Sequence, residues 1–214
     1  MDPRELLDYV VIGDANRAEE WTRQAIDAGI DCVVIVDEGL IPAMEIVGAR
    51  FSSGEIYVPE MLVSAAAMKA SLALLRPLLA TQGRDVSRGK VVIGTVKGDI
   101  HDIGKNIVAA MLEGAGFDVH DIGVDVSADG FVDAVRSYRP QILCLSALLT
   151  ATMPMMQTVI DALNQSGLRS SVKILVGGAP VTEEFARKIA ADGYAPNAPA
   201  AARKARALME PAVP

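Results

Sequence analysis

One stretch decides the fold, Val91-Val92-Ile93-Gly94-Thr95-Val96-Lys97-Gly98-Asp99-Ile100-His101-Asp102-Ile103-Gly104-Lys105-Asn106, because it joins an apolar run to a polar loop bounded by glycines. The β-branched run predicts a buried parallel strand, and the apolar spacing that begins at Lys105 predicts a helix. A loop between such a strand and helix lies at the carboxyl end of the strand, where open α/β sheets bind their ligands. The stretch therefore predicts an α/β fold and the position of its site.

The loop contains His101, one of 2 histidines in the chain, with Asp99 two residues before it and Gly104 three residues after it. A metal-bound imidazole usually donates its other N–H to a carboxylate, and the Asp-x-His spacing suits that pairing. The loop on its own therefore indicates one imidazole, held by Asp99, that is offered to a large ligand.

Two other interpretations of the loop fail on its residues. A phosphate-binding P-loop needs four residues between its glycines and a Ser or Thr after the Lys. Here five residues separate Gly98 from Gly104, and Asn106 follows Lys105. A closed zinc site is short of ligands, because the loop has one histidine, a nearby acid and no cysteine.

Composition excludes several classes of protein. The 20 Lys and Arg against 27 Asp and Glu leave a net charge of −7, which argues against nucleic acid as a partner. No uninterrupted apolar stretch of about 18 residues occurs, so we expect no membrane partner. The N-terminus has neither a basic lead nor an apolar signal core, which predicts a cytoplasmic protein. Cys32 and Cys144 lie in apolar surroundings and are expected to be buried, reduced thiols.

The first part of the chain, residues 1–80, predicts a four-helix bundle. Its apolar stripes cover four segments, namely 2–12, 15–28, 32–51 and 59–79. The third segment is expected to break near Gly39 and Pro42. The polar residues 81–89 interrupt every periodicity and predict a linker.

The second part, residues 90–214, alternates strands with helices. The expected strands are 90–96, 117–122, 141–146, 172–176 and a short extended piece near 193–195; the expected helices are 105–115, 127–138, 153–166, 181–191 and 197–209. Such repeats predict a doubly wound, five-stranded parallel sheet of flavodoxin-like (Rossmann-like) order. In that order the ends of the first and third strands are neighbours, and they carry His101 and Ser146.

Three motifs at successive strand ends resemble the cobalamin-binding domain of corrinoid proteins from methyltransferase systems: Asp99-x-His101-x-x-Gly104, Ser146-x-Leu148 and Gly177-Gly178. The segment Gly54–Ala65 is similar to the helical cap that precedes this domain in methanol, methylamine and aryl-ether corrinoid proteins. The resemblance implies a cobalamin cofactor bound with its own base displaced, so that His101 is the lower axial ligand of cobalt.

The resemblance also implies roles for other residues. Asp99 and Ser146 would complete a His–Asp–Ser relay with His101, with the Ser146 hydroxyl bonded to the Asp99 carboxylate. The implied cofactor contacts are Gly98, Asp99, Ile100, His101, Asp102, Ile103, Gly104, Ser146, Leu148, Thr150, Gly177, Gly178, Tyr194 and Ala195, and, from the helical cap, Tyr57, Met61, Leu62 and Met68. Thr152 extends the same loop as Leu148 and Thr150.

A carrier of this kind would shuttle a methyl group between two partners, as a corrinoid subunit without a substrate pocket of its own. One partner is a substrate-specific methyltransferase; the other transfers the methyl group to tetrahydrofolate or coenzyme M, and a reductive activase is a third implied partner. The cap would shield the cofactor and swing away through 80–89. Two alternatives remain: a cobalamin-sensing regulator, for which the chain has no basic output segment, and the cobalamin subunit of a mutase, against which the helical cap argues.

Overall fold

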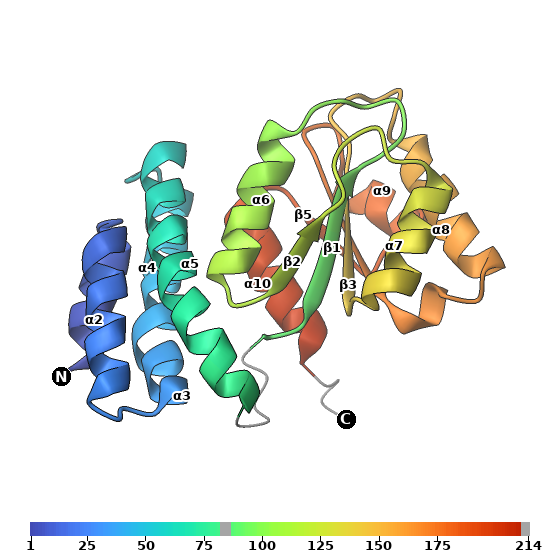
Figure 1. Cartoon of the computed structure of the whole chain (residues 1–214). Helices are drawn as coiled ribbons and strands as arrows, with labels where there is room; N and C mark the ends of the chain where they lie inside the picture. The colour runs from blue at the N-terminus through green and yellow to red at the C-terminus, as the bar shows by residue number, and fades with distance from the viewer. Residues whose placement is uncertain (82–86, 211–214) are drawn as a thin grey trace. The chain divides into compact units, whose positions relative to one another are not determined.

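A computed structural model describes residues 1–81 and 87–210, which form two compact units (Figure 1). A helical unit comprises Met1–Ser87 together with Glu113–Gly116, and an α/β unit comprises Arg88–Leu112 with Phe117–Pro214. Residues 82–86 of the expected linker and residues 211–214 of the expected second domain lie outside the described part of the chain.

The helical unit follows the four expected segments. Its elements are α1 (Pro3–Val11), α2 (Ala15–Asp27), α3 (Cys32–Val34), the π-helix η1 (Ile35–Leu40), α4 (Ile41–Ser53) and α5 (Val58–Thr81). Aspartate side chains cap the N-termini of the first two helices. Asp2 accepts a hydrogen bond from the Arg4 N–H, and Asp14 accepts one from the Arg17 N–H.

The break expected near Gly39 and Pro42 does not occur. The chain stays helical from α3 through α4, and one wider π turn carries it past these residues, with the Ile41 N–H donating to the Val36 carbonyl. Gly39 lies in this turn against α1, where a Cβ would come within 3.2 Å of the Leu6 side chain. The expected break was wrong because the wider π turn takes in an extra residue and lets the helix continue past Gly39 and Pro42.

Helix α5 is the long apolar helix of its unit, and its buried stripe includes Met61, Met68, Leu72, Leu75 and Leu79. Among the described residues, Val58–Leu79 is the one helical segment whose length and composition would also allow it to cross a membrane. The core helix of a bundle meets the same criterion, and α5 packs against α1, α2 and α4. Burial within the bundle accounts for its apolar character.

The α/β unit contains a five-stranded parallel sheet with the order β2-β1-β3-β4-β5, as the sequence predicts. The strands are β1 (Lys90–Thr95), β2 (Asp118–Asp121), β3 (Ile142–Ser146), β4 (Lys173–Gly177) and β5 (Gly193–Ala195); the helices are α6 (Ile103–Gly114), α7 (Ala128–Tyr138), α8 (Pro154–Gln165), the 3-10 turn η2 (Arg169–Ser171), α9 (Glu183–Lys188) and α10 (Ala198–Met209). Since β1 pairs with both β2 and β3, the order changes direction at β1 and β3. This is the switch point at which such sheets bind ligands.

Helices cover both faces of the sheet, with α6 and α10 on one side and α7, α8 and α9 on the other (Figure 1). The second layer encloses a core of fully buried side chains that includes Val92, Leu143, Ile174, Phe131 and Ile160. Helices on both faces explain why the strands read as continuous apolar runs rather than as alternating patterns.

Both cysteines are free and buried, as expected. Burial raises the pKa of the Cys144 thiol to about 12. The thiolate, which is the reactive form, is therefore rare at neutral pH in the folded chain.

We predict that Cys144 in a Cys32→Ser variant is not modified by a thiol reagent under native conditions and reacts fully in denaturant. Mass spectrometry of the labelled chain measures both. Rapid native labelling would contradict the burial of this strand.

Candidate functional site

The candidate site lies at the carboxyl edge of the sheet, where the loops after β1, β3 and β4 begin. The strand register places Thr95 beside Ser146, Ser146 beside Gly177, and Gly177 beside Ala195. Four strands thus end in one row, and the sequence motifs that follow them are brought together as predicted.

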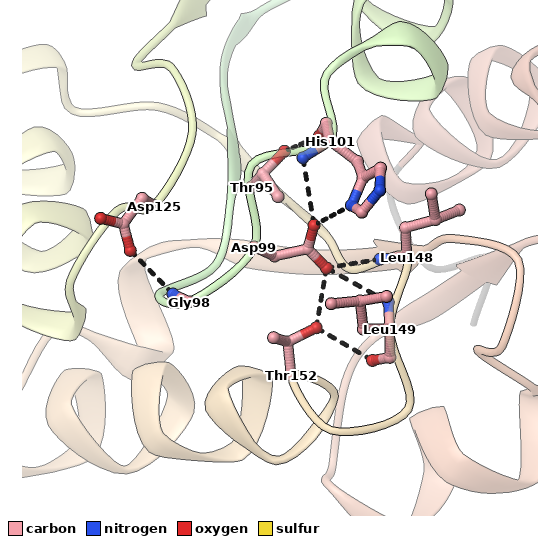
Figure 2. Close-up of polar contacts among 8 residues, drawn as sticks. All are labelled: Thr95, Gly98, Asp99, His101, Asp125, Leu148, Leu149 and Thr152. Atoms are coloured by element: carbon pink, nitrogen blue, oxygen red, sulfur yellow. Dashed lines mark hydrogen bonds and ion pairs between the residues drawn. The ribbon is translucent and has the colours of Figure 1, made fainter.

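The Asp99 carboxylate is the centre of this site, and it is fully buried (Figure 2). One oxygen, Oδ1, accepts the backbone N–H of His101 at 3.1 Å and lies 2.7 Å from the His101 ring atom Nδ1. The other, Oδ2, accepts the N–H groups of Leu148 and Leu149 at 2.8 and 3.2 Å and lies 2.7 Å from the Thr152 hydroxyl. The carboxylate therefore joins the loop after β1 to the loop after β3.

These hydrogen bonds decide the charge of Asp99. Burial by itself raises the pKa of this carboxyl, but the bonds donated by Thr152, His101 and Leu148 outweigh burial and hold the pKa well below its usual range. An ionised carboxylate only accepts hydrogen bonds, so the proton shared with His101 resides on Nδ1. The lone pair of the imidazole is consequently on Nε2, in a side chain that is 46% exposed.

The predicted hydrogen bond between Ser146 and Asp99 was wrong. No hydrogen bond joins the Ser146 side chain to Asp99 among the described residues, and the Thr152 hydroxyl occupies that position. Ser146 is still part of strand β3, whereas the chain must turn back through Leu148 and Leu149 before a hydroxyl can approach Oδ2. Thr152, at the end of that turn, is fixed further by the Leu149 carbonyl, 2.9 Å from its hydroxyl.

Gly178 allows the loop after β3 to reach Asp99. Its φ of +132° is one that side-chain-bearing residues rarely adopt, and a Cβ there would lie 1.9 Å from the Ala147 carbonyl oxygen. Ala147 directly precedes the two N–H groups that bind Asp99. In this structure the glycine therefore permits backbone packing under the site, and this packing alone accounts for its residue type.

Gly104 and several exposed apolar side chains follow the ends of β1 and β3, in the same two segments as His101 and Thr152. A Cβ at Gly104 would meet nothing within 4 Å, and its backbone conformation is open to any residue. Neither folding nor packing thus calls for glycine there. The exposed apolar side chains here are Ile100, Ile103 at the start of α6, Leu148 and Leu149, with the first two 75% and 76% exposed. Open space and apolar surface around an imidazole suit a large, flat, apolar ligand.

The remaining expected contacts fall into two groups. Asp102 and Thr150 are exposed in the same loops as His101 and Thr152. Tyr194 is partly buried and packs against the core on the side of the sheet covered by α7, α8 and α9. In the helical unit, Tyr57 and Leu62 are 69% and 41% exposed, but Met61 and Met68 are fully buried. In this structure the two methionine side chains lie on the buried stripe of α5, so neither is exposed for the ligand contact that the sequence predicts.

Sequence reasoning missed Asp125, in the loop after β2. Its Oδ1 accepts the Gly98 N–H at 2.8 Å, and its own N–H donates to the Asp99 carbonyl at 2.9 Å (the first bond is drawn in Figure 2). The Gly98 N–H and the ammonium of Lys97 hold the pKa of this carboxyl below its usual range. The one sequence signal is that Asp125 follows a strand next to β1 in the sheet.

The donor set limits what metal chemistry the site can perform. In the described ranges, 1–81 and 87–210, no three or more His, Cys, Asp or Glu side chains gather as a metal site. His101 could supply one ligand, but both oxygens of Asp99 already accept hydrogen bonds, so a metal bound here would have to bring its other ligands with it. The fold and site together define a flavodoxin-like domain with one half-exposed imidazole at its switch point.

Comparisons with known proteins identify the family and the class of its ligand. Two family models, both described as "B12 binding domain", match residues 89–203 and 4–76. A corrinoid protein of Desulfitobacterium hafniense is 42% identical over 207 residues (96% of each chain), and the trimethylamine corrinoid protein of Methanosarcina barkeri is 42% identical over 197 residues (92% of this chain, 91% of the relative). The methanol:cobalamin methyltransferase complex MtaBC of M. barkeri includes a chain that matches with a TM-score of 0.82 and 31% identity (95% of this chain, 78% of that one).

The chain belongs to the B12-binding family of corrinoid proteins from methyltransferase systems. Its cofactor is a corrinoid, and the residues around His101 fit that group: a free imidazole nitrogen, a position open beside Gly104 and an apolar surface.

We predict that Thr152→Val lowers the free energy of unfolding by about 1.5–3 kcal/mol, because a buried carboxylate loses a hydroxyl donor. Thr152→Ser keeps the donor and should cost less than about 1 kcal/mol. Ser146→Ala, which removes a hydroxyl that Asp99 does not use, is the matched control and should also cost less than about 1 kcal/mol. Urea unfolding followed by circular dichroism measures all three. A larger loss for Ser146→Ala than for Thr152→Val would reverse the assignment.

Proposed function

We propose that this chain is a corrinoid methyl carrier in which His101 Nε2 is the lower axial ligand of cobalt and the cofactor's own base is displaced. One observation carries the proposal. His101 Nδ1 lies 2.7 Å from the buried Asp99 carboxylate, so the other nitrogen of a half-exposed ring is left free to coordinate.

The loops around His101 would hold the rest of the cofactor. Ile100, Ile103, Leu148 and Leu149 offer apolar surface for the macrocycle, and Gly104 leaves room for its close approach. Candidates for contacts with the displaced nucleotide tail are the residues at the strand ends, namely Ser146, Thr150, Gly177, Gly178, Tyr194 and Ala195. When bound, the cobalt centre supplies a nucleophile that accepts a methyl group and later releases it to a second acceptor.

The residues of the chain orient the proposed ligating imidazole. Ionised Asp99 accepts the Nδ1 proton of His101, which leaves Nε2 as the nitrogen that would coordinate cobalt. The Thr152 hydroxyl and two backbone N–H groups keep Asp99 in place. The ring would therefore keep its orientation whether or not Nε2 is coordinated.

The partners would be a substrate-specific methyltransferase, a second methyltransferase with tetrahydrofolate or coenzyme M as acceptor, and a reductive activase. Relatives named for trimethylamine and dimethylamine, and a structural relative from a methanol methyltransferase complex, support the first of these partners.

The exposed Tyr57 and Leu62 are the candidates for cofactor contacts from the helical unit. We also propose a cytoplasmic location, which suits two free, buried cysteines.

Isotope labelling tests the axial ligand directly. We expect nitrogen-15-labelled protein loaded with unlabelled cob(II)alamin to show a paramagnetic resonance spectrum split into doublets by one axial nitrogen. The unlabelled protein should show triplets, since the two isotopes differ in nuclear spin. Triplets from the labelled protein would show that the ligand is the cofactor's own base and would overturn the proposal. His101→Ala is the control and should lose the coupling to protein nitrogen.

A second prediction concerns Gly104. We expect Gly104→Leu to leave the free energy of unfolding of the unloaded chain unchanged or to raise it by up to about 1 kcal/mol, because leucine favours helices more than glycine does. The same change should weaken the binding of hydroxocobalamin at least tenfold, as titration followed by absorbance would show. Unchanged binding would mean that the open space beside Gly104 is not used by the cofactor.

A further inference from the structure

The loop after β2 contacts the His101 loop from the side opposite to Thr152. Thr95 donates its N–H to the Gly123 carbonyl at 3.0 Å, and Val126 donates its N–H to the Thr95 carbonyl at 3.0 Å. Between these two bonds the chain passes through Asp125, whose φ is +55°. A positive φ is uncommon for any residue except glycine, and aspartate and asparagine tolerate it better than most others do.

That backbone conformation lets Asp125 bind the turn at Gly98 and Asp99 twice. Its side chain accepts the Gly98 N–H at 2.8 Å, and its main chain donates to the Asp99 carbonyl at 2.9 Å. Gly98 has a φ of +82°, which glycine adopts without strain, and this conformation belongs to the turn that the two bonds hold. The Lys97 ammonium lies 3.0 Å from the other carboxylate oxygen, as an exposed ion pair.

Asp99 is thereby held by two loops in different ways. The loop after β3 binds its side chain, as Figure 2 shows, and the loop after β2 binds its backbone. The direction of the Asp99 carboxylate depends on the backbone from which it projects. Because His101 is oriented by that carboxylate, a rotation of the turn at Gly98 would move the imidazole as well.

We propose that Asp125 is a positioning residue: it fixes the turn at Gly98 and Asp99 so that the His101 imidazole is presented to cobalt. The inference rests on the proposed function, since it concerns coordination by His101. Asp125 acts through this turn and not by touching the cofactor.

A double-mutant cycle tests the proposal on the full chain. The dissociation constant of cob(II)alamin is measured for the wild type and for Asp125→Ala, each with His101 present and in a His101→Ala background. With His101 present, we expect Asp125→Ala to weaken binding about fivefold, which is the effect of one lost hydrogen bond. The share of bound cob(II)alamin whose paramagnetic resonance signal is split by a protein nitrogen should also fall. In the His101→Ala background the same change should alter binding less than about twofold.

Three further variants separate the contributions of Asp125. Asp125→Asn keeps an oxygen acceptor and should restore most of the binding and coupling. Asp125→Gly accepts the positive φ without strain but lacks the acceptor, so it should behave like Asp125→Ala even where the alanine variant folds poorly. Lys97→Met removes the exposed ion pair alone and should stay within about twofold of the wild type.

The outcomes are distinguishable. Equal losses with and without His101 would show a merely structural role, and unchanged binding and coupling in both Asp125→Ala and Asp125→Gly would show no role; either result overturns the inference. Absence of protein-nitrogen coupling in the wild type would instead overturn the proposed function, and the inference with it.

Discussion

A buried, ionised carboxylate is stable only when hydrogen bonds replace the water that it has lost. Asp99 meets this requirement with donors from its own loop, at His101, and from the loop after β3, at Leu148, Leu149 and Thr152. The loop after β1 serves one oxygen, and the loop after β3 serves the other. The charge of Asp99 therefore forces two loops, almost fifty residues apart, into one arrangement, and the orientation of the imidazole follows from it.

The topology of the sheet makes that arrangement possible. Only neighbouring strands end close enough for one carboxylate to bond across their loops, and the order β2-β1-β3 gives β1 a neighbour on each side. The loop after β3 supplies donors to the side chain of Asp99, and the loop after β2 holds its backbone. Gly178, at the end of β4, completes the set by leaving room for the Ala147 carbonyl. The loops after β1, β2 and β3 thus meet at Asp99, and the loop after β4 makes room for one of them.

The sequence predicted the elements better than the contacts between them. Continuous apolar runs and helical stripes depend on local chemistry, so strands, helices and the sheet order followed from them. Which hydroxyl reaches Asp99 depends on the path of a loop, and Thr152 rather than Ser146 lies where that path returns. Helical spacing marked Met61 and Met68 as one face of α5 but could not tell a buried face from a ligand-facing one. Asp125 carries no motif, since its role arises from a backbone conformation and a neighbouring strand.

A carrier imposes a demand on its ligating residue that a permanent metal site does not. If His101 is the axial ligand proposed above, its imidazole would bind and release the metal during each cycle, and each rebinding would cost binding energy if the ring had to be ordered again. Here the bonds that order His101 come from the chain and involve Nδ1 and the backbone, so they do not depend on whether Nε2 is coordinated. A low pKa keeps Asp99 an acceptor in both situations. The buried carboxylate thus keeps the ring in one orientation, and this would hold whether or not a metal is bound at Nε2.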